Sequence, residues 1–184
     1  MRTAVILIVA SAALSAAEAN PPPLNTVMEL DLKRYAGRWF EIARLPNRFQ
    51  TSCAGEVTAT YRLRPDGKID VVNECSTDDG ALKSAKGQAR IVDGPMKLQV
   101  RFAPAWLSFL PMVWGDYWVI DLADDYSWAV VGEPAREFFW ILAREPRLSE
   151  AEIQAIVERA EEQGYDLSTM TRTRQRSLVE SPTQ

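Results

Sequence analysis

The feature that most constrains the fold is a glycine followed two positions later by a tryptophan, within the stretch from Tyr35 to Arg44. The aromatic and β-branched residues of this stretch favour a β-strand, and Gly37, which has no Cβ, lets another segment approach the backbone closely. Far downstream, an apolar run over 138–143 ends with a single arginine, Arg144. A guanidinium stacked on an indole is a favourable cation–π pair. Contact between Trp39 and Arg144 would therefore make the first and last core strands neighbours and close the sheet.

Short segments of alternating or apolar character recur along the chain, separated by turn residues. They predict eight antiparallel strands, over 35–44, 57–63, 68–75, 87–92, 96–102, 117–122, 128–132 and 138–143. Turns at 64–67, 93–95 and 123–125 join most of these strands into hairpins. We therefore expect an all-β protein, an eight-stranded antiparallel up-and-down barrel wide enough for one small ligand.

One helix is expected after the last of these strands. Ser149 and Glu152 form a capping box, and an apolar stripe of Ile153, Ile156, Val157 and Ala160 follows it. These residues predict a C-terminal amphipathic α-helix over 148–163, packed on the side of the barrel and ended by Gly164. A short additional strand is expected within 165–173.

The N-terminal residues read as a targeting segment. Arg2 precedes an apolar run over 4–14, and small residues follow up to Ala19. This pattern predicts a secretory signal peptide over 1–19, too short to span a bilayer as a permanent helix. No cysteine lies near the expected cleavage point, so no lipid attachment is expected there. The remaining chain, roughly 165 residues, has the size of one domain, which we place over 20–175, before a disordered tail over 176–184.

Composition excludes several classes of function. The chain has no histidine, which removes Ser-His and Cys-His catalysis, axial histidine ligation of haem and the commonest zinc ligand. We expect no metal site and no cofactor. The formal net charge of −4, with scattered charges, is unfavourable for binding nucleic acid.

The two cysteines, Cys53 and Cys75, are candidates for a disulfide in an exported chain. A three-residue hairpin loop with a left-handed Gly67 would put Val57 opposite Cys75, and Cys53 would lie just beyond that strand end. A structural disulfide is our interpretation, and two free thiols are the alternative.

Three blocks in order resemble the signature of the lipocalin family: Gly37-x-Trp39, the pair Asp125-Tyr126, and Arg144. The resemblance covers about residues 30–174 and is strongest to the bacterial outer-membrane lipocalins, with similarity also to plant temperature-induced lipocalins and apolipoprotein D. It implies a lipid-binding barrel in which these five residues are structural. It also implies a periplasmic protein of the cell envelope, associated with the outer membrane, and leaves a homodimer open.

If Trp39 points inward, the resemblance and the two-residue side-chain period together predict the cavity lining. The predicted ligand-binding residues are Val57, Ala59, Tyr61, Val71, Asn73, Val100, Phe102, Tyr117, Val119, Phe138 and Trp140. An aromatic and aliphatic wall with a few polar points suits an apolar ligand with one polar end. The alternative is a barrel that its own side chains fill completely.

The segment over 103–115 is apolar and carries no charge, although it connects two strands at the expected open end. Its candidate contact residues are Trp106, Leu107, Phe109, Leu110 and Trp114. An exposed apolar patch of this kind marks an interaction site, and tryptophan favours the membrane interface. We expect contact with a membrane or a partner subunit, and an inward-folded lid is the alternative.

The resulting expectation is a binding protein, not an enzyme, that stores or transports fatty acids or lysophospholipids in the bacterial envelope for membrane maintenance under stress. A lipocalin-type enzyme, for example an isomerase, would have to use Cys75 or the carboxylate pair Asp70 and Glu74. A carrier of another small hydrophobic ligand, such as a pigment, is the third class.

Overall fold

The computed structural model describes residues 22–176, so the predicted signal peptide and nearly all of the predicted tail lie outside the described residues. The strands of the barrel are β1 (Gly37–Arg44), β2 (Gly55–Leu63), β3 (Ile69–Ser76), β4 (Leu82–Ile91), β5 (Lys97–Arg101), β6 (Gly115–Leu122), β7 (Trp128–Gly132) and β8 (Phe139–Ala143). Each strand pairs antiparallel with the next, and β1 also pairs with β8. The sheet is therefore a closed eight-stranded barrel, as the sequence predicts.

The C-terminal segment pairs with the last residues of β1, beyond Phe40, where β1 no longer pairs with β2. The short strand β9 (Thr171–Arg172) pairs with Ala43 and Arg44 at the end of β1. Beyond it, the Gln175 side chain donates hydrogen bonds of 2.8 Å to the carbonyl oxygens of both Glu41 and Val57. One side chain thus bridges the gap between the first two strands.

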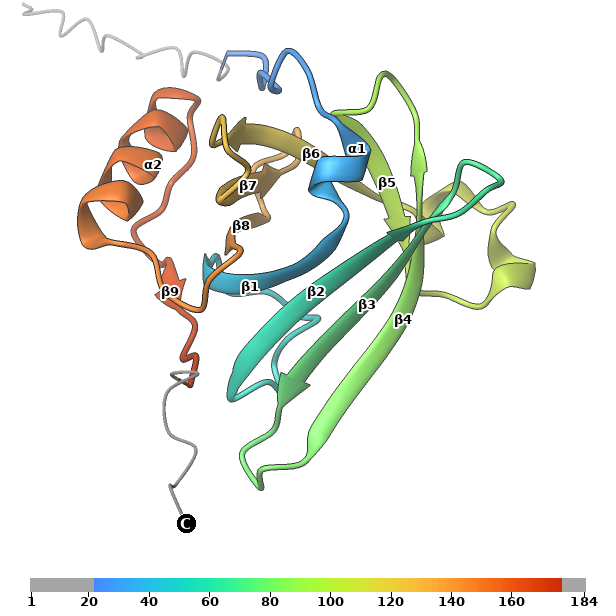
Figure 1. Ribbon diagram of the computed structural model, residues 1–184, viewed down its shortest axis with the longest axis horizontal. Coiled ribbons are helices and arrows are strands. Elements are labelled where there is room, and N and C mark those ends of the chain that lie inside the picture. The colour runs from blue at the N-terminus through green and yellow to red at the C-terminus, as the bar shows by residue number, and fades with distance from the viewer. Residues whose placement is uncertain (1–21, 177–184) are drawn as a thin grey trace, which may run out of the picture.

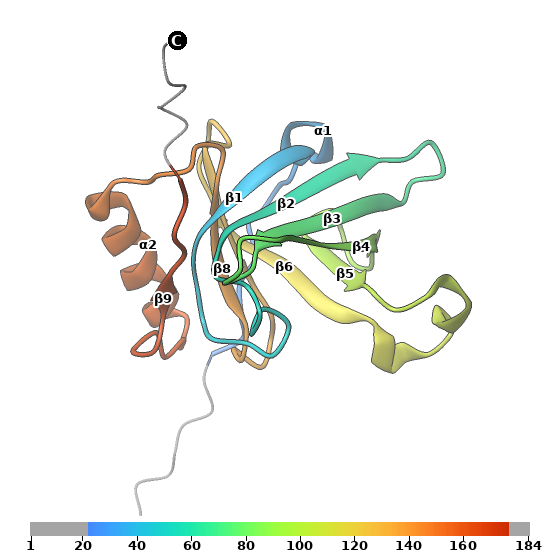
Figure 2. The same ribbon diagram turned by 90° about the horizontal axis from the view of Figure 1, so that it is seen from below.

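Helix α2 (Glu150–Glu162) packs on the outside of the barrel, opposite the loop that joins β5 to β6 (Figures 1 and 2). Its capping box is present, with Ser149 as N-cap and Glu152 at the third helical position. The buried side chains Ile153, Ile156 and Ala160 join a cluster with outward-facing residues of the barrel wall. No helix within residues 22–176 is long and apolar enough to cross a membrane.

The structure departs from the predicted boundaries at several elements. The single-turn helix α1 (Leu32–Tyr35) was not predicted, and β1 begins at Gly37 because this helix, N-capped by Asp31, ends just before it. Strand β4 begins at Leu82, well before the predicted start at 87. Its first half is exposed on both faces, so these residues show no apolar alternation. Phe138 precedes β8 and is not part of it.

Candidate ligand-binding site

The closed end of the barrel is plugged by Trp39 and Arg144, as the sequence predicts. Trp39 is fully buried, and the Arg144 guanidinium carbon lies 3.7 Å from its ring centroid. Arg144 also donates hydrogen bonds to the carbonyl oxygens of Arg34 (2.6 Å) and Arg38 (2.9 Å). A Cβ added to Gly37, whose φ is +101°, would lie only 3.2 Å from Arg144 Nη1. The missing side chain at residue 37 is therefore what admits the guanidinium.

The Asp125-Tyr126 pair forms the turn between β6 and β7 at the same end. Hydrogen bonds from Ser127, including one of 2.9 Å from its backbone N–H, lower the pKa of Asp125 below its usual range. The Tyr126 hydroxyl accepts a 2.8 Å hydrogen bond from the Asp31 N–H, and the Arg34 guanidinium carbon lies 3.9 Å from the Tyr126 ring centroid. The turn thus holds α1 against the base of the barrel.

Strand pairing shows which predicted lining residues face the interior, because residues paired across neighbouring strands share a face. Trp39 pairs with Ala59 and Ala59 with Asn73, while Val119 pairs with Val131 and Val131 with Trp140. Four of the predicted residues, Ala59, Tyr61, Val71 and Val119, are buried and belong to the interior cluster around Trp39. Val57 is also buried, but it lies within the bulge of β2 and outside that cluster. The remaining residues are only partly buried: Asn73, Val100, Tyr117, Phe138 and Trp140, with Phe102 44% exposed. Ligand contact by these residues stays a prediction.

Near the open end, part of the inward face of the barrel is exposed to solvent. Ala85 pairs with Asn73, so it shares the inward face, yet it is exposed. The Asn73 Oδ1 atom has no hydrogen-bond partner within residues 22–176. Phe102 packs against Gly87, where an added Cβ would lie 2.7 Å from its ring. Together these residues form an apolar, partly open inner wall with one unpaired acceptor.

Three tyrosines lie in the part of the barrel interior that side chains fill. The Tyr117 hydroxyl is 2.7 Å from that of Tyr35 and 2.8 Å from that of Tyr61. Burial raises the pKa of Tyr61 to about 12, and it raises the pKa of Tyr35 and of Tyr117 well above the usual range. All three side chains are therefore neutral O–H donors at physiological pH.

A buried polar cluster beside the open end was missed by the sequence reasoning. Glu41 is 3% exposed and accepts hydrogen bonds from Arg44 (2.8 Å), Gln50 (2.5 Å) and Thr173 (2.5 Å). Gln50 in turn accepts a 3.1 Å hydrogen bond from the Trp140 indole N–H. The sequence could have indicated this, because Glu41 lies two positions after Trp39 in the same strand and therefore shares its inward face. The cluster fixes the loop over 45–54 against β1, β8 and the C-terminal segment.

The predicted disulfide between Cys53 and Cys75 is present, with the two Cα atoms 5.6 Å apart. The strand pairing predicted beside the disulfide, with Val57 opposite Cys75, is interrupted by a register shift. Thr58 pairs with Glu74 but Gly55 pairs with Ser76, so a bulge with Glu56 at φ 55° replaces a simple Val57 to Cys75 pair. The extra residue could not be located because alternation alone does not show a bulge.

The apolar loop after β5 projects from the barrel (Figure 1) and contains two short 3₁₀ helices, Ala105–Leu107 and Pro111–Val113. Trp106 and Phe109 are each 73% exposed, whereas Leu107, Leu110 and Trp114 are partly buried. The exposed Trp106 and Phe109 rings favour an outward-facing loop over the alternative of an inward-folded lid, and the contact that the loop makes stays a prediction. Trp114 is covered by Arg90, whose guanidinium carbon lies 4.1 Å from its ring centroid.

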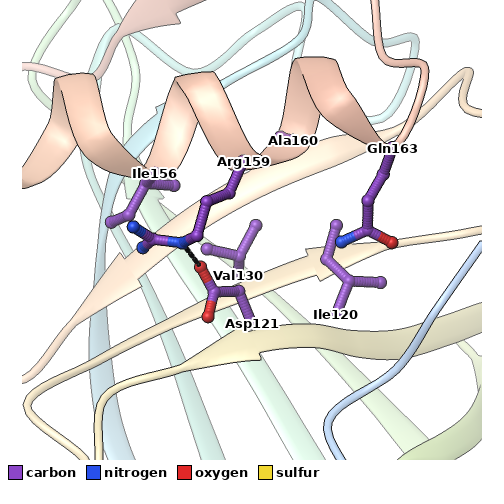
Figure 3. Close-up of a pocket in the computed structure, with 7 residues that line it drawn as sticks. All are labelled: Ile120, Asp121, Val130, Ile156, Arg159, Ala160 and Gln163. Atoms are coloured by element: carbon purple, nitrogen blue, oxygen red, sulfur yellow. Dashed lines mark hydrogen bonds and ion pairs between the residues drawn. The ribbon is translucent and has the colours of Figure 1, made fainter.

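Two pockets of the described residues border the barrel, and the first shares Gly87 and Phe102 with the inner wall. One, of about 350 Å³, lies where β4 meets the start of the apolar loop and is lined in part by Lys86, Arg101 and Phe102. The other, of about 120 Å³, lies between α2 and the outer wall (Figure 3). Arg159 and Asp121, which form an ion pair of 2.8 Å, are part of its lining. Its volume suits a few atoms and not a long amphiphile.

An antiparallel barrel plugged at one end, partly open and apolar at the other and flanked by one helix defines the class of β-barrels that hold small hydrophobic ligands. Residues 30–175 match the family model described as a lipocalin-like domain. The chain therefore belongs to the lipocalin family.

Curated relatives agree with this assignment. Temperature-induced lipocalin-1 of Arabidopsis thaliana is 39% identical over 155 residues, covering 83% of each chain. Outer membrane lipoprotein Blc of Escherichia coli strain K12 is 35% identical, covering 91% of this chain and 94% of that protein. Apolipoprotein D of Mus musculus is 33% identical, covering 84% of this chain and 80% of the relative.

Solved structures support the fold. Insecticyanin from the tobacco hornworm Manduca sexta has a TM-score of 0.65 at 21% identity, covering 85% of this chain and 87% of that chain. Apocrustacyanin C1 has a TM-score of 0.63 at 15% identity. At these identities the likeness concerns the fold alone.

Proposed function

We propose that this lipocalin binds fatty acids or lysophospholipids in its barrel and stores or moves them within the bacterial cell envelope, as part of membrane maintenance under stress. The observation that carries this proposal is the inner wall that is apolar yet accessible from the open end. Each methylene buried there contributes about 0.8 kcal/mol, so affinity is expected to rise with chain length. The envelope location is supported by the relatives named outer membrane lipoproteins and by the signal-like sequence over 1–19.

The experiment is displacement of a fluorescent fatty acid by amphiphiles of increasing chain length. A Val100→Trp variant, which fills the inner wall, is expected to weaken binding at least about tenfold. Val72→Trp is the matched control, because Val72 pairs with Thr60 and Lys86 on the neighbouring strands and so lies on the outward face of the barrel. The proposal fails if no amphiphile displaces the probe or if both variants bind as the natural protein does.

The positions of the candidate catalytic groups favour a binding role over an enzymatic one. Cys75 is held in the disulfide, so its thiolate is not available as a nucleophile. Asp70 and Glu74 pair with Arg62 and Thr58, which places both carboxylates on the outward face of β3. A carboxylate pair on that face could not act on a ligand inside the barrel.

The apolar loop is the proposed membrane contact. Trp106 and Phe109 present aromatic rings to solvent at the open end, where they could enter the interface of a bilayer. Replacing both with serine is expected to reduce co-sedimentation with phospholipid vesicles, whereas serine at the partly buried Leu107 alone should have a smaller effect. If the natural protein is instead a dimer that the double variant dissociates, the loop is a subunit contact.

A further inference from the structure

The three tyrosines inside the barrel come from segments far apart in the sequence and meet at one point. Tyr35 ends α1, Tyr61 lies on β2 and Tyr117 lies on β6. The Tyr117 hydroxyl is in the middle, 2.7 Å from the Tyr35 hydroxyl and 2.8 Å from the Tyr61 hydroxyl. Each phenol carries one proton to donate.

Counting those protons shows that one donor is left over. Two hydrogen bonds join the three hydroxyl groups, so they use two of the three protons. None of the three hydroxyls has another hydrogen-bond partner among the part of the chain that the structure describes. An unpaired buried donor costs about 1–3 kcal/mol, so an acceptor that reaches this proton would gain most of that penalty back.

Tyr117 is the least buried residue of the cluster. Tyr35 and Tyr61 are 2% and 5% exposed, whereas Tyr117 is partly exposed. It pairs with Leu98 on the inward face and lies toward the open end of β6. When Tyr35 and Tyr61 both donate to the Tyr117 oxygen, the Tyr117 proton is the free one, on the least buried residue of the three.

The surroundings of the cluster favour an uncharged acceptor. The neighbouring groups are aromatic or aliphatic, with the Trp39 ring centroid 5.0 Å from that of Tyr35. Arg144, the cation on the far face of Trp39, is already bonded to backbone carbonyl oxygens. A carboxylate placed here would lose its hydration and gain no direct bond from Arg144, whose N–H groups point to carbonyl oxygens, and this loss costs more than one phenol can return.

We propose that the Tyr35, Tyr61 and Tyr117 cluster is a donor subsite that binds a neutral oxygen acceptor, a ketone or ester carbonyl, at the deep end of the ligand. This inference rests on the proposed function and narrows it. The preferred ligand is an apolar chain whose leading end carries a carbonyl oxygen. Any charged group of the same ligand stays at the open end.

The test compares 2-undecanone with undecane as competitors of a fluorescent fatty acid, in the natural protein and in Tyr117→Phe. The variant is expected to bind the ketone about fivefold more weakly and the alkane equally well. Tyr165→Phe is the matched control, because Tyr165 is also buried but its hydroxyl bonds to the Glu133 backbone outside the barrel. This control should leave both affinities unchanged.

A second readout does not depend on affinity. The infrared carbonyl band of bound 2-undecanone is expected at lower wavenumber in the natural protein than in Tyr117→Phe, because a hydrogen bond weakens the carbonyl bond. The subsite is refuted if the band is the same in both proteins, or if Tyr117→Phe weakens ketone and alkane equally. If neither competitor displaces the probe although fatty acids do, the subsite fails and the proposed function stands. If fatty acids fail as well, both fail.

Discussion

At the scale of single residues, Arg144 joins the end of the last barrel strand to the segment that enters the first. Its guanidinium stacks on Trp39 and donates to carbonyl oxygens of the segment that enters β1. The contact therefore links β8 to the start of the barrel through one side chain.

Arg144→Ala is expected to lower the free energy of unfolding by about 3 kcal/mol, because it removes the cation–π contact and several charged hydrogen bonds at once. Urea denaturation followed by tryptophan fluorescence measures it. Arg62→Ala, at an exposed arginine on β2, is the control and should change stability by less than about 0.5 kcal/mol. Equal effects at the two arginines would contradict the role given to Arg144.

Gly37→Ala is expected to destabilise the barrel by about 2 kcal/mol, since it combines an unfavourable backbone angle with crowding against Arg144. Gly67→Ala separates the two effects. Gly67 has φ +78° but nothing within 4 Å of an added Cβ, so only the backbone cost remains there. A smaller loss at Gly37 than at Gly67, measured by thermal unfolding, would show that the guanidinium is not crowded.

The residues that the sequence identified correctly were those with a distinctive chemistry at a fixed spacing. Trp39 and Arg144 were paired from type, position and the resemblance to the lipocalin signature, and Cys53 and Cys75 from type and position. Glu41 was not recognised, because an acidic residue in a strand is ordinarily on the solvent face. Tyr35 was taken as part of the first strand, so the cluster it forms with Tyr61 and Tyr117 could not be foreseen.

At the scale of elements, the order of strands and the helix could be predicted, but several boundaries could not. Alternation marks a strand only where one face is buried, and the first half of β4 is exposed on both faces. The helix α1 has a single turn and lacks the apolar period of a longer helix. Bulges in β1, β2 and β6 shift the register without any signal in composition.

The disulfide is the element-scale restraint whose removal is most informative. Replacing both cysteines with alanine is expected to cost about 3 kcal/mol, as the bond closes a loop with a sequence separation of 22. It also releases the segment over 45–54 beside the open end. Denaturation curves measure the first effect and limited proteolysis within 45–54 the second. Unchanged stability together with unchanged protease resistance would show that the polar cluster around Glu41 holds this segment alone.

At the scale of the whole molecule, the buried tyrosines predict how stability depends on pH. The pKa of Tyr61 is raised to about 12 and those of Tyr35 and Tyr117 are raised well above their usual range, all mainly by burial. In the unfolded chain these phenols ionise near pH 10, so the unfolded state loses its protons first. Stability is therefore expected to be intact below about pH 10 and to fall as pH rises toward about 12.

Urea midpoints between pH 9 and 12, with phenolate absorbance recorded in parallel, check this expectation. Lysine ionisation also acts in this range, so Tyr117→Phe supplies the comparison. With one buried phenol removed, the variant should lose stability less steeply over the same interval. An identical slope for the two proteins would mean that the cluster does not couple ionisation to unfolding.

The bond between Arg144 and the start of β1 spans 106 positions of the sequence. Contacts of such separation form late in folding, because the loop between them must be ordered first. Hairpins made from neighbouring strands can form earlier, while β1 and β8 are still edge strands that have not paired with each other. A nascent chain interrupted before residue 144 would leave two unsatisfied margins, and chaperone capture or self-association is its expected fate.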